Sequence, residues 1–238
     1  IGGIGFLTWE DIKNNKLHFR RYRMQSKVIL TVTGILIIMP AVYFFFFEYQ
    51  SLPMGERILT SLFQSVTPRT AGFNTTDLTA FSETGQMLII LLMLIGGSPG
   101  STAGGMKTTT IAVLVSSALS VFRKKKDTHF FKRRIPDYTV KSAASIFLLY
   151  IGLFIGGGMI ISRLENIPLL PSLFETASAI GTVGLSLGIT SQLGIVSQFI
   201  LIVLMFLGRV GGLTLIFAAM KGTETNVTKY PQEKITVG

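Results

Sequence analysis

The 238-residue sequence contains no cysteine, a single tryptophan and few charged residues, which make up 14% of the chain. Without cysteine there is no disulfide scaffold and no cysteine-ligated metal site. The charged fraction is well below the roughly one quarter that is usual in soluble domains, and the mean hydropathy is +0.55. An apolar fraction of 48% excludes a disordered chain. The composition therefore indicates an integral membrane protein.

Patterns typical of catalysis or metal binding are also lacking. No nucleophile lies beside a base in a known motif, and acidic residues such as Glu175 form no catalytic constellation. His18 and His129 each stand in a basic segment, which favours solvated side chains over metal ligands. We therefore expect no enzymatic activity and no transition-metal site.

Long uncharged runs dominate what is present. Residues 28–47 and 142–162 hold 20 and 21 residues without a charge, enough for one crossing each of about 30 Å of hydrocarbon. Residues 176–208 are also uncharged but are interrupted by glycines. Residues 84–122 contain one charge, and as a single helix they would be roughly 58 Å long. That length is nearly two membrane thicknesses, so we expect this run to break.

Basic residues gather in three segments, which are residues 13–27, residues 123–141 and the C-terminal tail 221–238. Even numbers of expected crossings separate them, so the positive-inside rule places all three in the cytoplasm. The net charge of +10 is then a signal of membrane orientation rather than a nucleic-acid-binding surface. We expect no nucleic-acid partner, and contact with anionic membrane lipid or a cytosolic protein instead.

A segment of similar pattern follows each outward crossing. Residues 61–74 and residues 172–186 both begin with Ser-Leu-Phe and a Gln or Glu, and both end with a Thr-x-Gly motif. Each is too short and too polar for another crossing, which predicts a re-entrant helix followed by a loop. The chain is therefore expected to be all-α, built twice from a span, a short helix, a loop and a returning span.

The glycine of Thr-x-Gly allows backbone angles that a Cβ forbids. A loop of this kind can turn its carbonyl oxygens toward one axis, where they replace the hydration shell of a cation. Carbonyl oxygens suit a large monovalent ion better than a small divalent one. The alternative interpretation is a pair of ordinary extracellular loops with turn glycines. This alternative is less favoured, because the Thr-x-Gly motif occurs twice and at matching places between the expected spans.

The Gly/Ser/Thr-rich stretch 96–105 is where the longest run is expected to break, because each Gly in a helix costs about 1 kcal/mol and a Pro about 3 kcal/mol. A plain kink is one interpretation. A phosphate-binding loop is another, but Met106 separates Gly105 from Lys107 and no strand precedes the segment. A gate beneath the ion-binding loops is the third. Arg209 favours the gate, because an arginine among apolar residues needs polar partners such as loop carbonyls; snorkelling to the inner interface is its alternative.

The motifs resemble a known family. Thr182-Val183-Gly184 is similar to the start of the potassium-channel filter, and the complete pattern resembles the Trk/Ktr/HKT superfamily of potassium transporters. Residues 70–74 and 96–108 look like that family's third filter and the loop that follows. The resemblance implies four repeats of span, pore loop and span around one central pore, of which this chain holds the third and fourth. The implied organisation is the end of the preceding repeat's last helix at 1–12, a cytoplasmic loop at 13–27, the third repeat at 28–122 with a gate loop at 96–107, a basic cytoplasmic loop at 123–141, the fourth repeat at 142–220 and a cytoplasmic tail at 221–238.

Site residues follow from the same resemblance. Gly72 and Gly184 align with the single glycine that the family keeps in each repeat. Leu185-Ser186 stand where a potassium channel has Tyr-Gly, which indicates a shorter and less stringent filter. The implied filter backbone, which would hold K+, consists of Thr70, Ala71, Gly72, Phe73, Thr182, Val183, Gly184 and Leu185. The implied gate consists of Gly96, Gly97, Ser98, Gly100, Gly104, Gly105, Lys107 and Arg209.

The function implied by the resemblance is potassium uptake across a bacterial plasma membrane down an electrochemical gradient, with sodium as an open second candidate and no covalent cofactor. The multi-pass subunit would be a homodimer standing on a cytosolic ring of nucleotide-binding, KtrA-like regulatory subunits. A tightly sodium-coupled symporter, a non-conducting membrane scaffold and an ATP-driven pump are the alternatives. The repeated Thr-x-Gly motif argues against the scaffold, and the missing Walker geometry argues against the pump.

Overall fold

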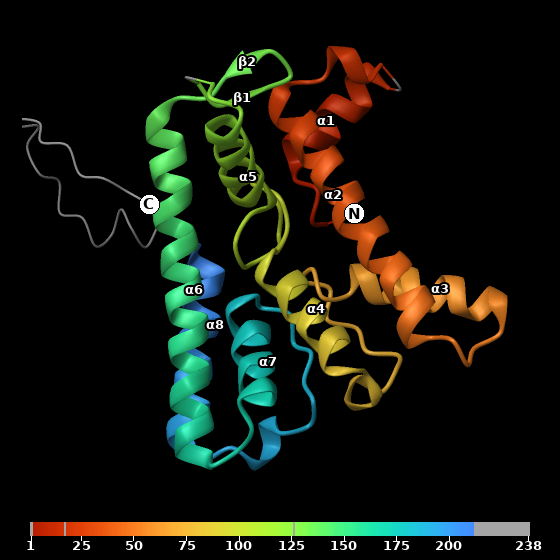
Figure 1. Ribbon diagram of the computed structural model, residues 1–238, viewed down its shortest axis with the longest axis vertical. Coiled ribbons are helices and arrows are strands. Elements are labelled where there is room, and N and C mark those ends of the chain that lie inside the picture. The colour runs from red at the N-terminus through yellow and green to blue at the C-terminus, as the bar shows by residue number, and fades with distance from the viewer. Residues whose placement is uncertain (1, 17, 126, 212–238) are drawn as a thin grey trace, which may run out of the picture.

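The computed structural model describes residues 2–16, 18–125 and 127–211 (Figure 1). These residues are mostly helical, accompanied by one short two-stranded hairpin. The expected all-α membrane fold is confirmed. The tail expected at 221–238 and the last part of the fourth repeat, residues 212–220, lie outside the described residues.

The molecule contains two similar sets of helices, in residues 24–94 and 137–210. Each set has, in chain order, an outer helix, a short helix and an inner helix. In chain order the elements are α1 (Phe6–Asn15), a 3-10 turn (Phe19–Arg21), α2 (Met24–Tyr43) with a π-helical continuation (Phe44–Glu48), α3 (Met54–Val66), a 3-10 turn (Leu78–Ala80), α4 (Glu83–Leu94), α5 (Thr108–Phe122), β1 (His129–Phe130), β2 (Arg133–Arg134), α6 (Asp137–Glu165), α7 (Leu169–Ile180), a 3-10 turn (Thr190–Gln192) and α8 (Ile195–Val210).

The outer helices have the length of membrane spans. In the described part of the chain, two helices are long and apolar enough to cross a membrane: α2 with its continuation, 25 residues, and α6, 29 residues. The short helices α3 and α7 have 13 and 12 residues, too few to cross, as the sequence predicts for re-entrant segments. α7 packs against α6 and α8 of its own set and against α4 of the other (Figure 1). The two sets therefore share one core.

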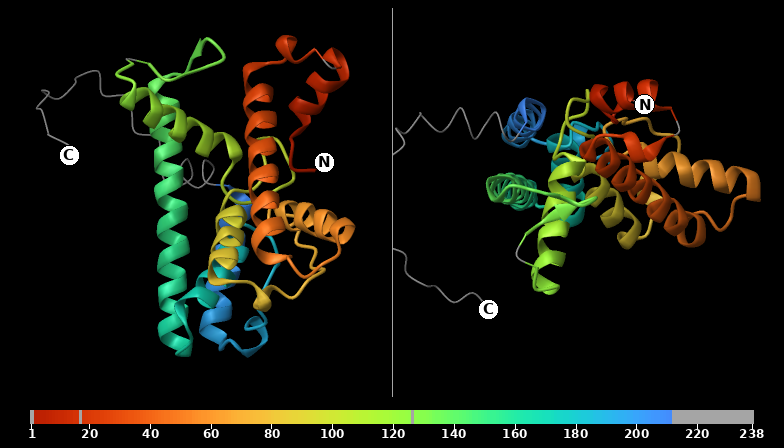
Figure 2. Two further views of the ribbon diagram at one scale, coloured as in Figure 1. Left: turned by 45° about the vertical axis from the view of Figure 1, so that its right-hand side comes forward. Right: turned by 90° about the horizontal axis from the view of Figure 1, so that it is seen from above.

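The longest apolar run breaks where its glycines predict. α4 ends at Leu94 and α5 begins at Thr108, and Figure 2 shows the two as separate helices joined by a loop. Side chains of α4, α6, α7 and α8 form the main core beside this break, with Phe174, Ile89 and Met93 fully buried in it. The packing places the loop between the two helix sets.

The start of the chain departs from the helix end expected at residues 1–12. Helix α1 begins only at Phe6, because the residues before it pair with the loop that follows α4. The N–H of Ser98 donates to the carbonyl of Gly3 at 2.8 Å, and the N–H of Phe6 donates to the carbonyl of Gly100 at 3.1 Å. These long-range bonds replace the local bonds that a helix would make.

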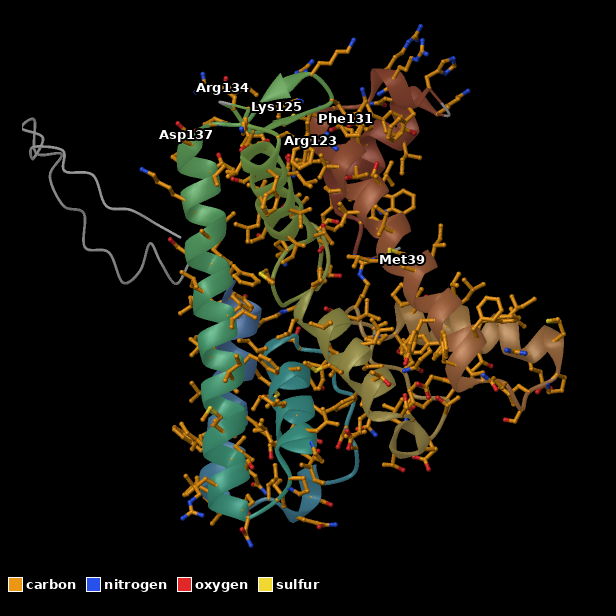
Figure 3. The ribbon with its side chains drawn as sticks, viewed as in Figure 1. Met39, Arg123, Lys125, Phe131, Arg134 and Asp137 are labelled. Atoms are coloured by element: carbon orange, nitrogen blue, oxygen red, sulfur yellow. The ribbon has the colours of Figure 1, made fainter. Side chains whose placement is uncertain are left out.

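The two basic loops lie at the same end of the molecule. The ammonium nitrogen of Lys27 lies 5.8 Å from the centre of the Phe131 ring, and this contact joins the first turn of α2 to the β1–β2 hairpin. Figure 3 shows Arg123, Lys125 and Arg134 at this end. Their common location is what the expected even number of crossings between them requires.

Two glutamates at the opposite end connect the outer and inner helices of each set. Glu48, at the end of the α2 continuation, accepts hydrogen bonds from the N–H of Ser82, at 3.1 Å, and from its hydroxyl. Glu165, at the end of α6, accepts from the N–H of Gly194 at 2.9 Å and from the hydroxyl of Ser197 at 2.5 Å. Ser82 and Gly194 are the N-caps of α4 and α8. A carboxylate at a helix N-terminus satisfies unpaired N–H groups and complements the helix dipole.

We predict that Glu165→Ala lowers the thermal unfolding midpoint of the complete protein in detergent. Loss of a capping acceptor costs about 1 kcal/mol, and the hydroxyl of Ser197 would lose its acceptor as well. Glu56→Ala is the matched control, because Glu56 is an exposed acid in the first turn of α3 with no bonding partner in the described ranges. Equal midpoints for the two variants, measured by thermal unfolding, would contradict the role of Glu165.

Candidate functional site

The loops after α3 and α7 share an uncommon backbone conformation. The φ angle is positive at Thr70 (62°) and Gly72 (72°) in the first loop, and at Thr182 (50°) and Gly184 (92°) in the second. A threonine with positive φ is rare, because its branched Cβ crowds the backbone. When residues of negative and positive φ alternate, successive peptide groups point the same way, so that their N–H groups line one side of the loop. The repeat in the sequence therefore extends to the conformation of the loops.

The N–H groups of both loops are bonded back to the preceding helix. Ala71 and Gly72 both donate to the carbonyl of Thr67, at 3.1 and 2.9 Å. Val183 donates to the carbonyl of Ser178 at 2.9 Å. Among the described residues, none donates a hydrogen bond to the carbonyl oxygens of Ala71, Gly72 or Val183. These oxygens remain available to a ligand.

The two loops lie against each other. The hydroxyl of Thr70 donates to the carbonyl of Gly181, at the end of α7, at 3.3 Å. A Cβ at Gly72 would lie only 1.9 Å from the carbonyl oxygen of Val183. No side chain fits there, so Gly72 is required both for its backbone angle and for this close approach.

The loop between α4 and α5, residues 95–107, contacts the start of the loop after α7. A Cβ at Gly104 would lie 2.1 Å from the hydroxyl oxygen of Thr182. The N–H of Gly105 donates to the carbonyl of Gly208, in the last turn of α8, at 3.2 Å. The 95–107 loop is thus packed against Thr182 and against α8.

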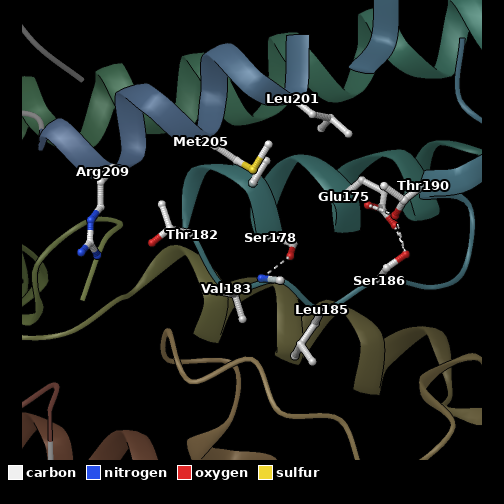
Figure 4. Close-up of a pocket in the computed structure, with 12 residues that line it drawn as sticks. Glu175, Ser178, Thr182, Val183, Leu185, Ser186, Thr190, Leu201, Met205 and Arg209 are labelled. Carbon is white, nitrogen blue, oxygen red and sulfur yellow. Dashed lines mark hydrogen bonds between the residues drawn. The ribbon is translucent and has the colours of Figure 1, made fainter. Parts of the chain in front are cut away.

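Two cations donate to carbonyls of this loop from its inner side. A terminal nitrogen of Arg209 donates to the carbonyl of Thr102 at 2.6 Å, and Figure 4 shows the Arg209 side chain extending from α8 toward the loop. The ammonium group of Lys107 donates to the carbonyl of Ala103. The contact between Arg209 and the loop carbonyls, predicted from the sequence, is confirmed.

Arg69 is a third cation on the loop, and sequence reasoning missed it. A terminal nitrogen of its guanidinium donates to the carbonyl of Gly96 at 3.3 Å. Arg69 directly precedes Thr70, so it connects the loop after α3 to the beginning of the 95–107 loop. An arginine beside a filter-like motif in an apolar protein was the available signal.

An open cavity of about 510 Å³ lies between α7, the loop that follows it and α8 (Figure 4). It extends from Ser186 to Arg209. Its lining includes carboxylate and hydroxyl groups beside apolar side chains, contributed by Glu175, Ser178, Thr182, Ser186, Thr190, Leu201, Met205 and Arg209.

The sequence profile of the TrkH family, described as a cation transport protein, matches residues 9–229. The chain belongs to this family. It is 36% identical over 248 residues to the Ktr system potassium uptake protein B of Bacillus subtilis, covering all of this chain and 54% of that protein. It is 37% identical over 249 residues to the potassium/sodium uptake protein NtpJ of Enterococcus hirae, covering all of this chain and 55% of that protein.

A solved structure agrees with this membership of the TrkH family. The crystal structure of the potassium transporter TrkH from Vibrio parahaemolyticus superimposes with a TM-score of 0.73 at 19% identity, covering 91% of this chain and 49% of that one. At that identity the likeness concerns the fold. The TrkH family consists of cation transport proteins rather than enzymes, and the chain spans about half the length of the curated relatives it matches.

Not all of the expected site residues lie together. The carbonyl of Phe73 accepts the hydroxyl of Thr67 at 2.5 Å, so it faces the short helix rather than standing free like its neighbours. Gly97, Ser98 and Gly100 form the part of the loop nearest residues 2–6, whereas Gly104 and Gly105 form the part against residues 181 and 182. The 95–107 loop therefore has two sides with different contacts.

We predict that Gly208→Ala lowers the thermal unfolding midpoint, because the new Cβ would lie 2.0 Å from the carbonyl oxygen of Ile180. Gly156→Ala in α6 should raise it, since no atom lies within 4 Å of that Cβ position and alanine favours a helix by about 1 kcal/mol. A midpoint in Gly208→Ala that is unchanged or raised, as in Gly156→Ala, would show that α8 does not approach α7 closely at Gly208.

Proposed function

We propose that the complete protein is a membrane pore subunit for potassium uptake, with sodium as a second transported ion. The ion would pass through a filter of backbone carbonyls that includes Thr70, Ala71 and Gly72 from one repeat. Thr182, Val183, Gly184 and Leu185 would contribute from the other repeat. Relatives named for potassium uptake and for potassium/sodium uptake support this choice of ions.

One observation carries the proposal. The N–H groups of Ala71, Gly72 and Val183 are bonded to the end of the preceding helix, while the carbonyl oxygens of these three residues have no donor among the residues described. Free carbonyls inside a membrane protein need a cation or water as partner. The C-terminal ends of α3 and α7 add partial negative charge at the same place, which favours a cation. Two loops supply half of a ring, so the rest of the complete protein would provide the other half.

The 95–107 loop is proposed as the gate. It packs beneath Thr182, and Arg209 binds it through the carbonyl of Thr102. Lys107 adds a second positive charge at the inner side of the loop. Two cations on the path oppose the passage of a third until they are displaced.

The basic end of the molecule is proposed to face the cytoplasm. Residues 13–27 and 123–141 carry most of the positive charge of the described residues, which suits anionic lipid headgroups. The same surface would receive a KtrA-like cytosolic ring of nucleotide-binding subunits under a homodimer of the complete protein. This assignment follows from the relation to a Ktr system subunit.

We predict that Gly72→Ser and Gly184→Ser reduce the preference for potassium over sodium, with Gly72→Ser the more severe. Gly72 lacks room for a Cβ, whereas Gly184 has no atom within 4 Å of that position and only its φ of 92° opposes a side chain. Uptake of both ions by cells without their own potassium transporters measures the ratio. An unchanged ratio in both variants would remove these glycines from the filter.

We predict that Arg209→Ala raises potassium flux into proteoliposomes by about tenfold in the absence of an activator, because a hydrogen bond from a charged group contributes about 1.5 kcal/mol or more. Arg209→Lys, which keeps the charge but loses the planar donor geometry, should raise flux less. Flux equal to that of the unsubstituted protein in both variants would exclude Arg209 from the gate.

A further inference from the structure

A buried carboxylate stands behind the second filter loop. Glu175, on α7, is only 4% exposed. One of its oxygens accepts the hydroxyl of Ser186 at 2.5 Å and the other accepts the hydroxyl of Thr190 at 2.8 Å (Figure 4). The two hydroxyl oxygens lie 2.8 Å from each other. Ser186 directly follows Leu185, so the carboxylate reaches the end of the proposed filter that is farther from the 95–107 loop.

The same face of α7 also holds the filter glycine. The hydroxyl of Ser178 accepts the N–H of Gly184 at 3.1 Å. Glu175 and Ser178 are three residues apart in a helix, so their side chains point the same way. The N–H of Gly188 donates to the hydroxyl of Ser186 at 2.9 Å and closes the turn beyond the filter. The loop is therefore held from behind at Gly184 and at Ser186, one residue on either side of Leu185.

The first repeat lacks this arrangement. Alignment of the two Ser-Leu-Phe motifs places Gln64 at the position of Glu175. Gln64 is 1% exposed, and its amide nitrogen has no partner in the ranges that the structure describes. The first loop is held instead by Thr67, which donates to the carbonyl of Phe73. Among the described residues, a buried carboxylate that binds hydroxyls of the following loop is thus found only behind the second loop.

We propose that Glu175 is a positioning residue for ion selection: it holds the carbonyls of residues 182–185 at ion-binding spacing through Ser186 and Thr190. Its partners within hydrogen-bonding distance are hydroxyls, and no basic side chain of the described chain forms an ion pair with it. The inference rests on the proposed function. A filter held less firmly would tolerate the shorter oxygen distances that sodium requires.

The test compares Glu175→Ala, Glu175→Gln, Ser186→Ala and Thr190→Val in the complete protein, in cells without their own potassium transporters. We expect Glu175→Ala to raise the KM for potassium and to lower the potassium-to-sodium ratio by about five- to tenfold, the effect of losing one to two hydrogen bonds. Glu175→Gln, which keeps one acceptor, should restore part of the ratio. Ser186→Ala and Thr190→Val should each lower it without changing the amount of protein in the membrane.

Glu165→Ala is the matched control, because it removes a partly buried carboxylate that likewise accepts a serine hydroxyl, at the outer end of the same repeat and away from the filter. It should lower thermal stability and leave the ion ratio unchanged. Normal KM and ion ratio in Glu175→Ala would overturn the inference, as would equal losses in Glu175→Gln and Glu175→Ala with normal Ser186→Ala and Thr190→Val. Absence of potassium uptake by the unsubstituted protein would instead refute the proposed function.

Discussion

The structure depends on how backbone polar groups are satisfied inside a membrane protein. In hydrocarbon, an N–H or C=O without a partner costs several kcal/mol. The loops after α3 and α7 satisfy only one kind of backbone group. Their N–H groups bond to the ends of the short helices, whereas the carbonyls of Ala71, Gly72 and Val183 have no donor among the described residues. Helix length, positive φ at Thr70 and Thr182, and the glycines that follow all serve to hold this one-sided arrangement.

Close contacts at glycines join the loop after α7, the 95–107 loop and α8. Gly104 lies against Thr182, and Gly208 lies against the carbonyl of Ile180. The N–H of Gly105 donates to the carbonyl of Gly208 at 3.2 Å. Because glycine lets these backbones approach without intervening side chains, the three segments pack as one unit. If the 95–107 loop moved away, the carbonyl of Gly208 would need another hydrogen-bond donor.

The two repeats solve the same structural problem with different chemistry. At equivalent positions of the short helices, the first repeat has an amide, Gln64, and the second a carboxylate, Glu175. Arg69 binds the beginning of the 95–107 loop from the first repeat, and Arg209 binds its later part from the second. The two repeats therefore differ in their side-chain contacts, although their short helices and loops follow a similar path.

The amino-acid sequence by itself determined the helix lengths, the break after Leu94 and the two filter-like loops, because hydrophobic runs, glycines and turn residues act locally. It also indicated that Arg209 needs carbonyl partners. Tertiary structure decided that Gly3 pairs with Ser98 of the 95–107 loop, so that α1 begins only at Phe6. It also brought Ser186 and Thr190 to Glu175. These contacts join separate segments of the chain, and their formation depends on packing in three dimensions, which local preference does not encode.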